Sequence, residues 1–254
     1  MAFTTEDHGR VLVLRLDRPE ARNAIDAVTS AAIESAIDRL EADDDLWVGV
    51  ITHEGPVFCA GADLKVVASG GGKGIATERG GFAGICTRRR TKPILAALEG
   101  PAVAGGCEIA LACDVIVATT AVSFSIPEAK RALVATGGGP FRLTQVVGPK
   151  LANELVMTGD ALDATRAYSL GLVNQLVEPG QALVSALALA DRINANAPLA
   201  VRESLALSRD AVGRSEDESW AATDAASRRN AATEDFQEGP RAFVEKRAPH
   251  WTGR

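Results

Sequence analysis

The stretch that decides the fold is GPAVAGGCEIALACDVIVA, residues 100–118. GGCEIALAC predicts a short helix, DVIVA (114–118) predicts a strand, and the glycines and proline before them are typical of a turn. After Glu99 the stretch is almost wholly apolar or small, yet Glu108 stands in its middle. Burial of an ionised carboxylate without partners is costly or raises its pKa. This glutamate therefore needs an explanation.

Strands and helices alternate on both sides of this stretch. The apolar runs VLVLRL (11–16), WVGVIT (47–52) and PILAAL (93–98) predict strands. Between the first two, apolar residues recur every three or four positions over 24–42, which predicts an amphipathic helix with Asn23 as its N-cap. The glycine-rich segment 68–81 predicts a long loop. The alternation favours an α/β architecture.

The sequence from about residue 140 onward is helical in pattern. Two amphipathic stretches, 181–197 and 199–212, are separated by Pro198, and a polar, alanine-rich tail follows. Such an extension can fold back on its own domain or dock on another subunit, and the pattern leaves both alternatives open.

The composition limits the kinds of protein to consider. Of the 254 residues, 46% are hydrophobic, which predicts a folded domain with a sizeable core. The apolar runs are too short to span a bilayer and the N-terminus lacks the pattern of a secretory signal, so we expect a cytoplasmic protein without a membrane partner. The net charge of −6 argues against nucleic acid as the main partner.

Motifs for metal and nucleotide chemistry are not found in the sequence. The four cysteines and three histidines lack metal-ligand spacing, so neither a metal site nor a disulfide framework is expected. The patterns GxxxxGK[ST], GxSxG and HExxH do not occur. The basic run TRRRTK (87–92) is interpreted as a solvated loop or helix face in preference to an anion site.

Two glycine-containing segments could present backbone amides to a substrate. Gly105 and Gly106 stand at the predicted start of a helix, where free N–H groups and the helix dipole can stabilise an oxyanion. Tight packing of the helix on a strand is the alternative explanation. CAGADLK (59–65) has a similar layout, although Asp63 could simply cap a helix.

A second acid, Glu128, lies in FSIPEAK (124–130), and the glycine cluster ATGGGP (135–140) follows it. A lone glutamate in a loop is usually solvated. Two glutamates in small or apolar surroundings, each near a glycine cluster, can divide the roles of acid and base.

In this order, FCAGADLK, AGGCEIALACDVIVA and FSIPEAKRALVATGGGPFRL resemble the enoyl-CoA hydratase/isomerase (crotonase) superfamily, and the hydratase branch most of all. The resemblance continues to FVEKR near the end of the chain. It implies a spiral of ββα turns with an acyl-CoA site in residues 1–195. It also implies a helical trimerisation region in 196–254, hence a homotrimer or a hexamer of two trimers.

The resemblance also assigns roles to residues. It implies an oxyanion hole formed by the amides of Ala62 and Gly105, with Glu108 and Glu128 as the catalytic acids. The expected contacts with substrate or CoA are Ala60, Asp63, Leu64 and Lys65, together with Phe243 and Lys246, which would reach the CoA of a neighbouring subunit. Coenzyme A is then part of the substrate, and no separate cofactor is expected.

The presence of both acids favours hydration of a 2-enoyl-CoA over isomerisation. An isomerase, a carnitinyl-CoA-type dehydratase and a non-catalytic acyl-CoA-binding protein remain alternatives. Three residues depart from the usual family pattern: Ala104 replaces a glycine, Ala135 a proline, and Ile126 a residue that is polar in many short-chain hydratases. These departures bear on the choice of substrate.

Overall fold

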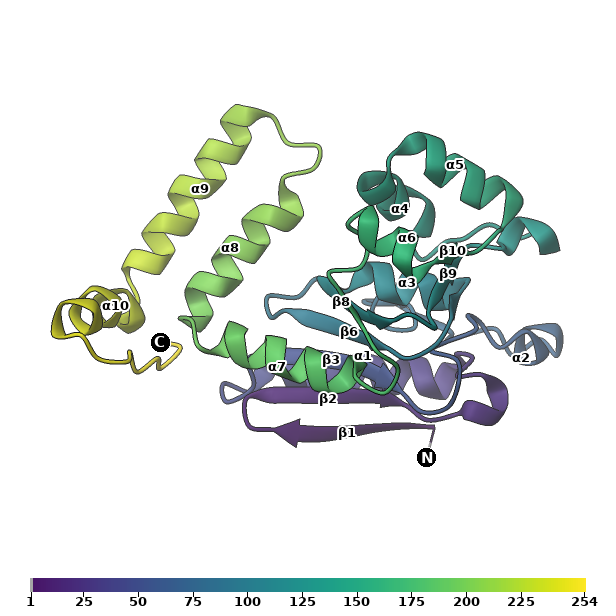
Figure 1. Ribbon diagram of the computed structural model, residues 1–254, viewed down its shortest axis with the longest axis horizontal. Helices are drawn as coiled ribbons and strands as arrows, with labels where there is room; N and C mark the ends of the chain where they lie inside the picture. The colour runs from purple at the N-terminus through teal and green to yellow at the C-terminus, as the bar shows by residue number, and fades with distance from the viewer. Residues whose placement is uncertain (1) are drawn as a thin grey trace.

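A six-stranded sheet forms the centre of the structure, a computed structural model that describes residues 2–254 (Figure 1). Its strand order is β1-β2-β3-β6-β8-β11, and all neighbours are parallel except β1 and β2. The strands are β1 (Phe3–His8), β2 (Val11–Leu16), β3 (Val48–His53), β6 (Ile94–Leu98), β8 (Val115–Thr119) and β11 (Gln175–Val177).

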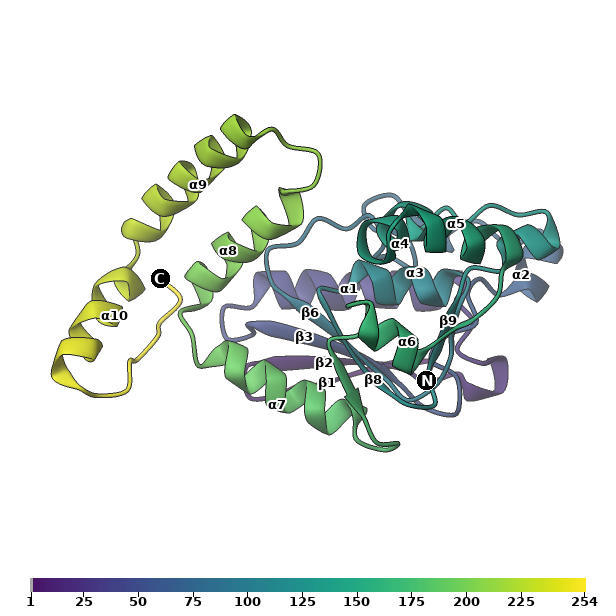
Figure 2. The same cartoon turned by 45° about the horizontal axis from the view of Figure 1, so that its top comes forward.

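Helices cover both faces of this sheet, which explains why its central strands are apolar throughout. In β6, Ile94, Ala96 and Leu98 join the core on one face, whereas Leu95 and Ala97 join the core on the other. The second face is covered by α7 (Ala182–Asn194), which packs through a stripe of buried alanines: Ala182, Ala186 and Ala190. The first face lies beneath α1 (Ala27–Ala42) and α3 (Gly105–Ala112) (Figures 1 and 2).

A second, smaller sheet has the order β10-β9-β7 and brings the predicted site segments together. Its strands are β7 (Ala102–Val103), β9 (Ser123–Ser125) and β10 (Leu162–Asp163), and an isolated bridge adds Cys59 beside Ala102. Successive passes of the chain contribute first to the large sheet and then to the small one before a helix follows. This repeat of ββα turns confirms the predicted α/β fold class.

The remaining core elements follow in chain order. They are η1 (Pro19–Ala21), α2 (Leu64–Ala68), β4 (Ala76–Thr77), β5 (Gly81–Phe82), η2 (Glu128–Arg131), α4 (Gly139–Val147), α5 (Pro149–Thr158) and α6 (Ala164–Ser169). β4 and β5 form a short hairpin inside the glycine-rich segment that the sequence predicts as a loop.

The prediction of Asn23 as a helix N-cap is wrong. The helix begins at Ala27, and Asp26 caps it by accepting from the Thr29 amide. Asn23 has a positive φ of 53°, and its side-chain amide donates to the carbonyl oxygens of Glu54 and Val57. It therefore fixes a loop, because its short polar side chain tolerates the left-handed region and bonds backbone groups there.

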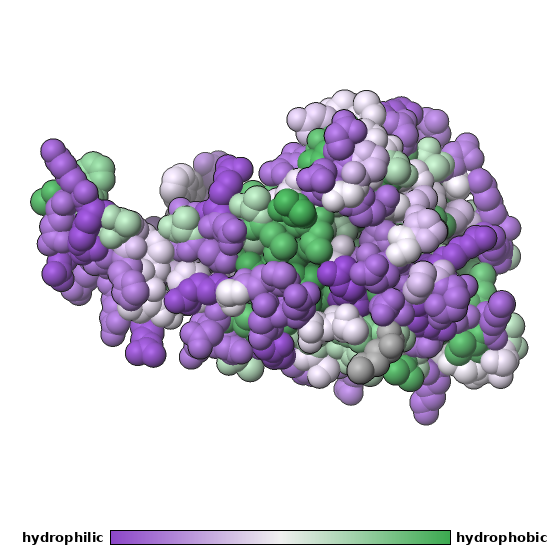
Figure 3. Space-filling view, turned by 60° about the horizontal axis from the view of Figure 1, so that its bottom comes forward, coloured by the Kyte–Doolittle hydropathy of each residue, from purple (hydrophilic) through white to green (hydrophobic). Residues whose placement is uncertain are grey.

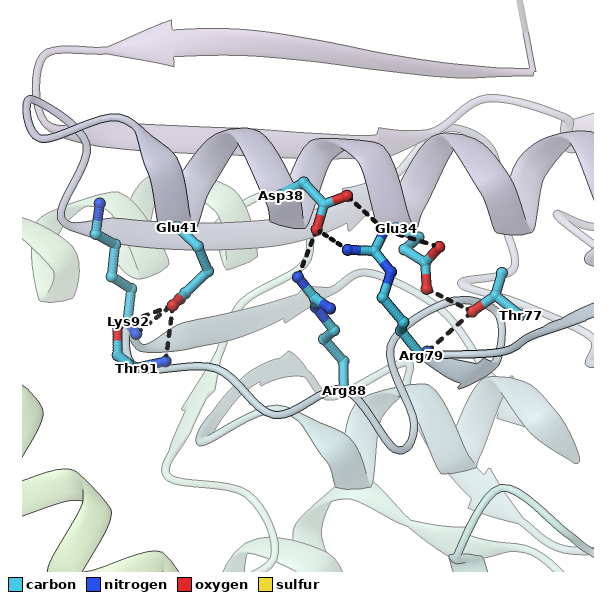
Figure 4. A network of polar contacts seen from close by, with 9 residues as sticks. Glu34, Asp38, Glu41, Thr77, Arg79, Arg88, Thr91 and Lys92 are labelled. Carbon is cyan, nitrogen blue, oxygen red and sulfur yellow. Dashed lines mark hydrogen bonds and ion pairs between the residues drawn. The ribbon is translucent and has the colours of Figure 1, made fainter.

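The basic run 87–92 is a loop, one of the forms expected from sequence, but it is only partly solvated: Thr87, Arg89 and Thr91 are exposed, whereas the other basic side chains bind the core. Arg88 pairs with Asp38 of α1, Arg90 pairs with Asp114, and the buried Lys92 ammonium donates to the carbonyl oxygens of Leu40 and Asp43. Figure 4 shows the contacts with α1. The run therefore attaches the segment before β6 to the end of α1.

Three helices at the C-terminal end extend away from the sheets as an arm: α8 (Pro198–Asp210), α9 (Glu216–Ala231) and α10 (Glu234–Glu245) (Figures 1 and 2). Arg209 of α8 attaches the arm to the core, since its Nε and Nη2 atoms each lie 2.7 Å from a carboxylate oxygen of Asp114. In Figure 3 one apolar area lies between the arm and the core on a largely polar face. No helix in residues 2–254 is both long and apolar enough to cross a membrane.

Candidate active site

The Gly105 amide lies at the start of α3, directly after the turn that follows β7. Ala104 makes this turn with φ 54° and ψ −128°, a conformation that side chains disfavour. As the first helical residue, Gly105 has no carbonyl partner in the preceding turn. The ring of Phe82 covers its α-carbon so closely that an added methyl group would lie 2.3 Å from the ring. An alanine here would therefore require the Phe82 ring to move.

The Ala62 amide belongs to a segment that runs against this same turn. An added methyl group on Gly61 would lie 3.0 Å from the Gly105 nitrogen, so the two segments touch. The Ile25 amide donates to the Gly61 carbonyl, and the Ile25 carbonyl accepts from the Asp63 amide. The Ala62 amide lies between these two hydrogen bonds. Throughout residues 2–254, neither Ala62 N–H nor Gly105 N–H donates to a protein acceptor.

Glu108 lies in the first turn of α3 and is 3% exposed. Its Oε1 accepts a hydrogen bond of 2.9 Å from the amide of Gly139, the first residue of α4. The carboxylate therefore meets the N-terminal ends of two helices, which favour an anion. Burial raises its pKa above the ordinary value, against the lowering effects of the amides of Gly139 and Gly137 and of the Arg142 charge.

Glu128 opens η2, three residues after the end of β9. The carbonyl oxygen of Ser125 accepts from Ala104 N at 2.9 Å, so this strand end lies beside the turn that leads to Gly105. Burial, together with the charge of Glu108, raises the pKa of Glu128. Its Oε2 is buried and has no hydrogen-bond partner within the described chain. Two acids of elevated pKa thus lie near two available amides.

The predicted CoA contacts near Ala62 surround the start of α2. Asp63 caps this helix, accepting from the amides of Lys65 and Val66, and it also pairs with Arg18 at 3.2 Å. Lys65 and Leu64 are exposed on the helix, and the Ala60 amide donates to the carbonyl of Arg22. The capping role that the sequence allows for Asp63 is therefore observed.

Phe243 and Lys246 lie on and at the end of α10, at the opposite end of the molecule from α2 (Figures 1 and 2). Phe243 is 85% exposed. Neither residue shares a site with Lys65 in the same chain, so any role beside CoA requires a second copy.

Sequence reasoning missed Phe82 and Arg142. Phe82 covers Gly105, and the Arg142 guanidinium donates to the carbonyls of Gly137 and Cys86. Arg142 is the only charged residue in α4 and follows the glycine cluster, a signal that could have identified it. Phe82 has no comparable local signal, because its contact joins segments distant in sequence.

The repeated ββα turns are those of a crotonase-type fold. The family model for enoyl-CoA hydratase/isomerase matches residues 6–254. Similar proteins include enoyl-CoA hydratase EchA19 of Mycobacterium tuberculosis (39% identity; 98% of this chain, 96% of that protein). Carnitinyl-CoA dehydratase of Salmonella arizonae is 40% identical (97% of this chain, 96% of that protein).

Solved structures agree with these relatives. The crystal structure of enoyl-CoA hydratase EchA1 from Mycobacterium marinum matches with a TM-score of 0.96 and 45% identity, covering 100% of this chain and 99% of that one. The chain belongs to the enoyl-CoA hydratase/isomerase family, as the motifs predict.

Proposed function

We propose that the protein is a 2-enoyl-CoA hydratase that adds water reversibly across the 2,3 double bond of an acyl thioester. The observation that carries this proposal is a pair of acids, the buried Glu108 and the half-buried Glu128 with its buried Oε2, near the available amides of Ala62 and Gly105. An isomerase moves a proton between two carbons, for which one acid is enough. A hydratase must hold a water molecule and also transfer a proton to carbon. Two acids serve the second task better.

The two amides polarise the substrate. With the thioester oxygen between Ala62 N–H and Gly105 N–H, electron density is drawn from C3, and the enolate-like charge of the transition state is stabilised. The close approach of Gly61 to Gly105 fixes the two donors before the substrate arrives. Such fixed donors cost little reorganisation during the reaction.

The two acids handle the water. Glu108 accepts a hydrogen bond from the water while the water oxygen forms its bond to C3. Glu128 takes the water proton and delivers a proton to C2, so that H and OH are both added and the acid is regenerated. The raised pKa of Glu128 supports this role, because an acid that titrates closer to neutrality exchanges protons more readily.

The coenzyme would bind across two chains in this proposal. Lys65 and the backbone of residues 60–64 contact its nucleotide near α2, while Phe243 and Lys246 come from a neighbour. The arm supports such assembly, since Trp220, Phe236, Phe243 and Val244 are exposed on α9 and α10. We therefore expect a homotrimer or a pair of trimers, which sedimentation equilibrium can test.

An activity profile tests the proposed reaction. Crotonyl-CoA and longer 2-enoyl-CoAs should lose their enoyl absorbance, and Glu108→Gln and Glu128→Gln should each slow turnover on the order of a hundredfold or more. Failure of the folded protein to hydrate any chain length would refute the proposal.

A wider thioester panel separates the alternatives. Preference for a 3-enoyl-CoA would identify an isomerase, and preference for a hydroxyacyl-CoA such as the carnitinyl thioester would identify a specialised dehydratase. A non-catalytic binding protein would bind these thioesters and convert none.

A further inference from the structure

Arg142 joins the two segments that flank the candidate active site. Its Nη1 donates to the Gly137 carbonyl at 2.8 Å, and its Nη2 donates to the Cys86 carbonyl at 2.6 Å. Gly137 belongs to the glycine loop, residues 137–139, which packs against the Glu108 carboxylate. Cys86 follows the hairpin that places Phe82 on Gly105. One guanidinium therefore connects the Glu108 side of the site to the oxyanion side.

The glycine loop needs such support from outside. Three consecutive glycines, 137–139, have large conformational freedom, and Gly138 has a φ of 96°. Larger side chains cannot stiffen the loop, since an added methyl group on Gly137 would lie 2.7 Å from Glu108 Oε2. The planar fork of an arginine can fix the loop without entering the site.

Arg142 also balances the charges around Glu108. The groups that face this carboxylate are Arg142 from α4, Glu128 from η2, and the thiols of Cys86 and Cys107. Arg142 is the one cation among them within the described residues. Burial raises the pKa of Glu108, and the Arg142 charge opposes that rise.

We propose that Arg142 is a positioning residue that holds the Gly139 amide against Glu108 and keeps this carboxylate in its charged, water-orienting form. Its guanidinium acts through the backbone, because it donates to the carbonyls of Gly137 and Cys86. Its kinetic test rests on the proposed hydratase function, whereas its thermal test does not.

The kinetic test compares Arg142→Met with Arg142→Lys. The methionine variant should lose kcat on the order of tenfold to a hundredfold with little change in KM, because the water is misplaced rather than the thioester. The acidic limb of its pH–kcat profile should move to higher pH. The lysine variant keeps the charge and should restore the position of that limb with only part of kcat. A methionine variant with the wild-type profile would overturn the proposal.

A thermal cycle tests the same point without substrate. A carboxyl whose folded-state pKa is raised destabilises the fold increasingly as pH rises from the ordinary value to the folded one. Glu108→Gln should therefore raise Tm near pH ~8. The gain should be larger in the Arg142→Met background, where the opposing charge is gone. Equal gains in the two backgrounds would contradict the proposal. If the wild-type chain converts no thioester, only the hydratase function fails, and this cycle still decides the role of Arg142.

Arg79→Met is the matched control. Arg79 pairs with Glu34 and Asp38 and attaches the same hairpin to α1 from its far side (Figure 4). Its loss should lower Tm. The acidic limb of the pH–kcat profile and the Tm gain from Glu108→Gln should both stay unchanged. If this control moved the limb as far as Arg142→Met does, general loosening of the hairpin would explain the effect, and the proposal would be wrong.

Discussion

At the scale of single residues, Glu128 combines a buried, unpartnered Oε2 with a pKa raised by burial and by Glu108. Because the folded-state pKa exceeds the ordinary one, this residue costs stability above its folded pKa and costs none well below its ordinary pKa. Glu128→Gln should therefore raise Tm near pH ~8 and leave it unchanged near pH ~3.5.

Scanning calorimetry at both pH values checks this sign. The same variant should lose nearly all hydratase activity, so that stability and activity change in opposite directions. A Tm gain that is equal at the two pH values would show that ionisation of Glu128 is not its cause.

Ala104 stores backbone strain beside the Gly105 amide. Its φ of 54° with ψ of −128° suits glycine better than a residue with a side chain. Relief of about 1–3 kcal/mol of strain should exceed the roughly 0.5–1 kcal/mol entropy cost of glycine. Ala104→Gly should thus stabilise the fold by about 1 kcal/mol, a Tm increase of about 2–4 °C.

The control for this substitution is Ala221→Gly, in the interior of α9 and exposed. An alanine with ordinary helical geometry should be about 1 kcal/mol more stable than glycine. Thermal unfolding should therefore give opposite signs for the two variants; the same sign would rule out strain at Ala104.

Residue-level prediction from sequence works where the cause is local. Glu108 attracts attention because it lies in an apolar run, and the structure shows it buried with a glycine amide as partner. Asn23 fails as a predicted cap because its bonds go to Glu54 and Val57, which pattern reasoning cannot connect to it. Arg142 is intermediate between these cases: its place after the glycine cluster is a local signal, but its bond to the Cys86 carbonyl joins residues that are distant in sequence.

At the scale of elements, the sequence predicts β2, β3, β6, β8 and α3 to within a residue or two, because their apolar runs are continuous. It misses β1 and the β4–β5 hairpin, and the helical pattern predicted from about residue 140 onward overlooks β10 and β11, the latter an edge strand of the large sheet. FTTEDH of β1 is mostly polar and mostly exposed, and it becomes a strand through its pairing with β2. Side chains of α1 hold the hairpin; for example, the Glu34 carboxylate accepts a hydrogen bond from the Thr77 hydroxyl (Figure 4).

The short helix α2 depends on Asp63. This residue caps the helix, pairs with Arg18, and follows Ala62 directly. Asp63→Ala should release the cap, loosen the oxyanion segment and lower kcat/KM about tenfold, whereas Asp63→Asn retains a capping oxygen and should lose less. Steady-state kinetics measures both. Equal losses would assign the effect to the Arg18 ion pair and not to the cap.

At the scale of the whole molecule, the chain returns from the arm to the core near the start of α8. Asp235 of α10 accepts from the amides of Thr252 and Gly253, and the Trp251 indole donates to the Ala195 carbonyl at 2.9 Å. These bonds fix α10 relative to α7 and α8. The exposed end of α10 is therefore held at a defined place, which the proposed contact with a neighbouring copy requires.

This geometry makes the proposed sharing of CoA testable by mixing two defective variants. Lys246→Ala should raise KM for acyl-CoA several-fold with kcat nearly kept, because one charge-assisted contact with the coenzyme is lost. Glu128→Gln should abolish turnover. In mixed assemblies, an intact Glu128 site can receive Lys246 from a Glu128→Gln neighbour. Some sites should then recover wild-type KM after the variants are unfolded together and refolded. If Lys246 served its own chain, the mixture would show only the high KM of the Lys246→Ala parent at half its activity.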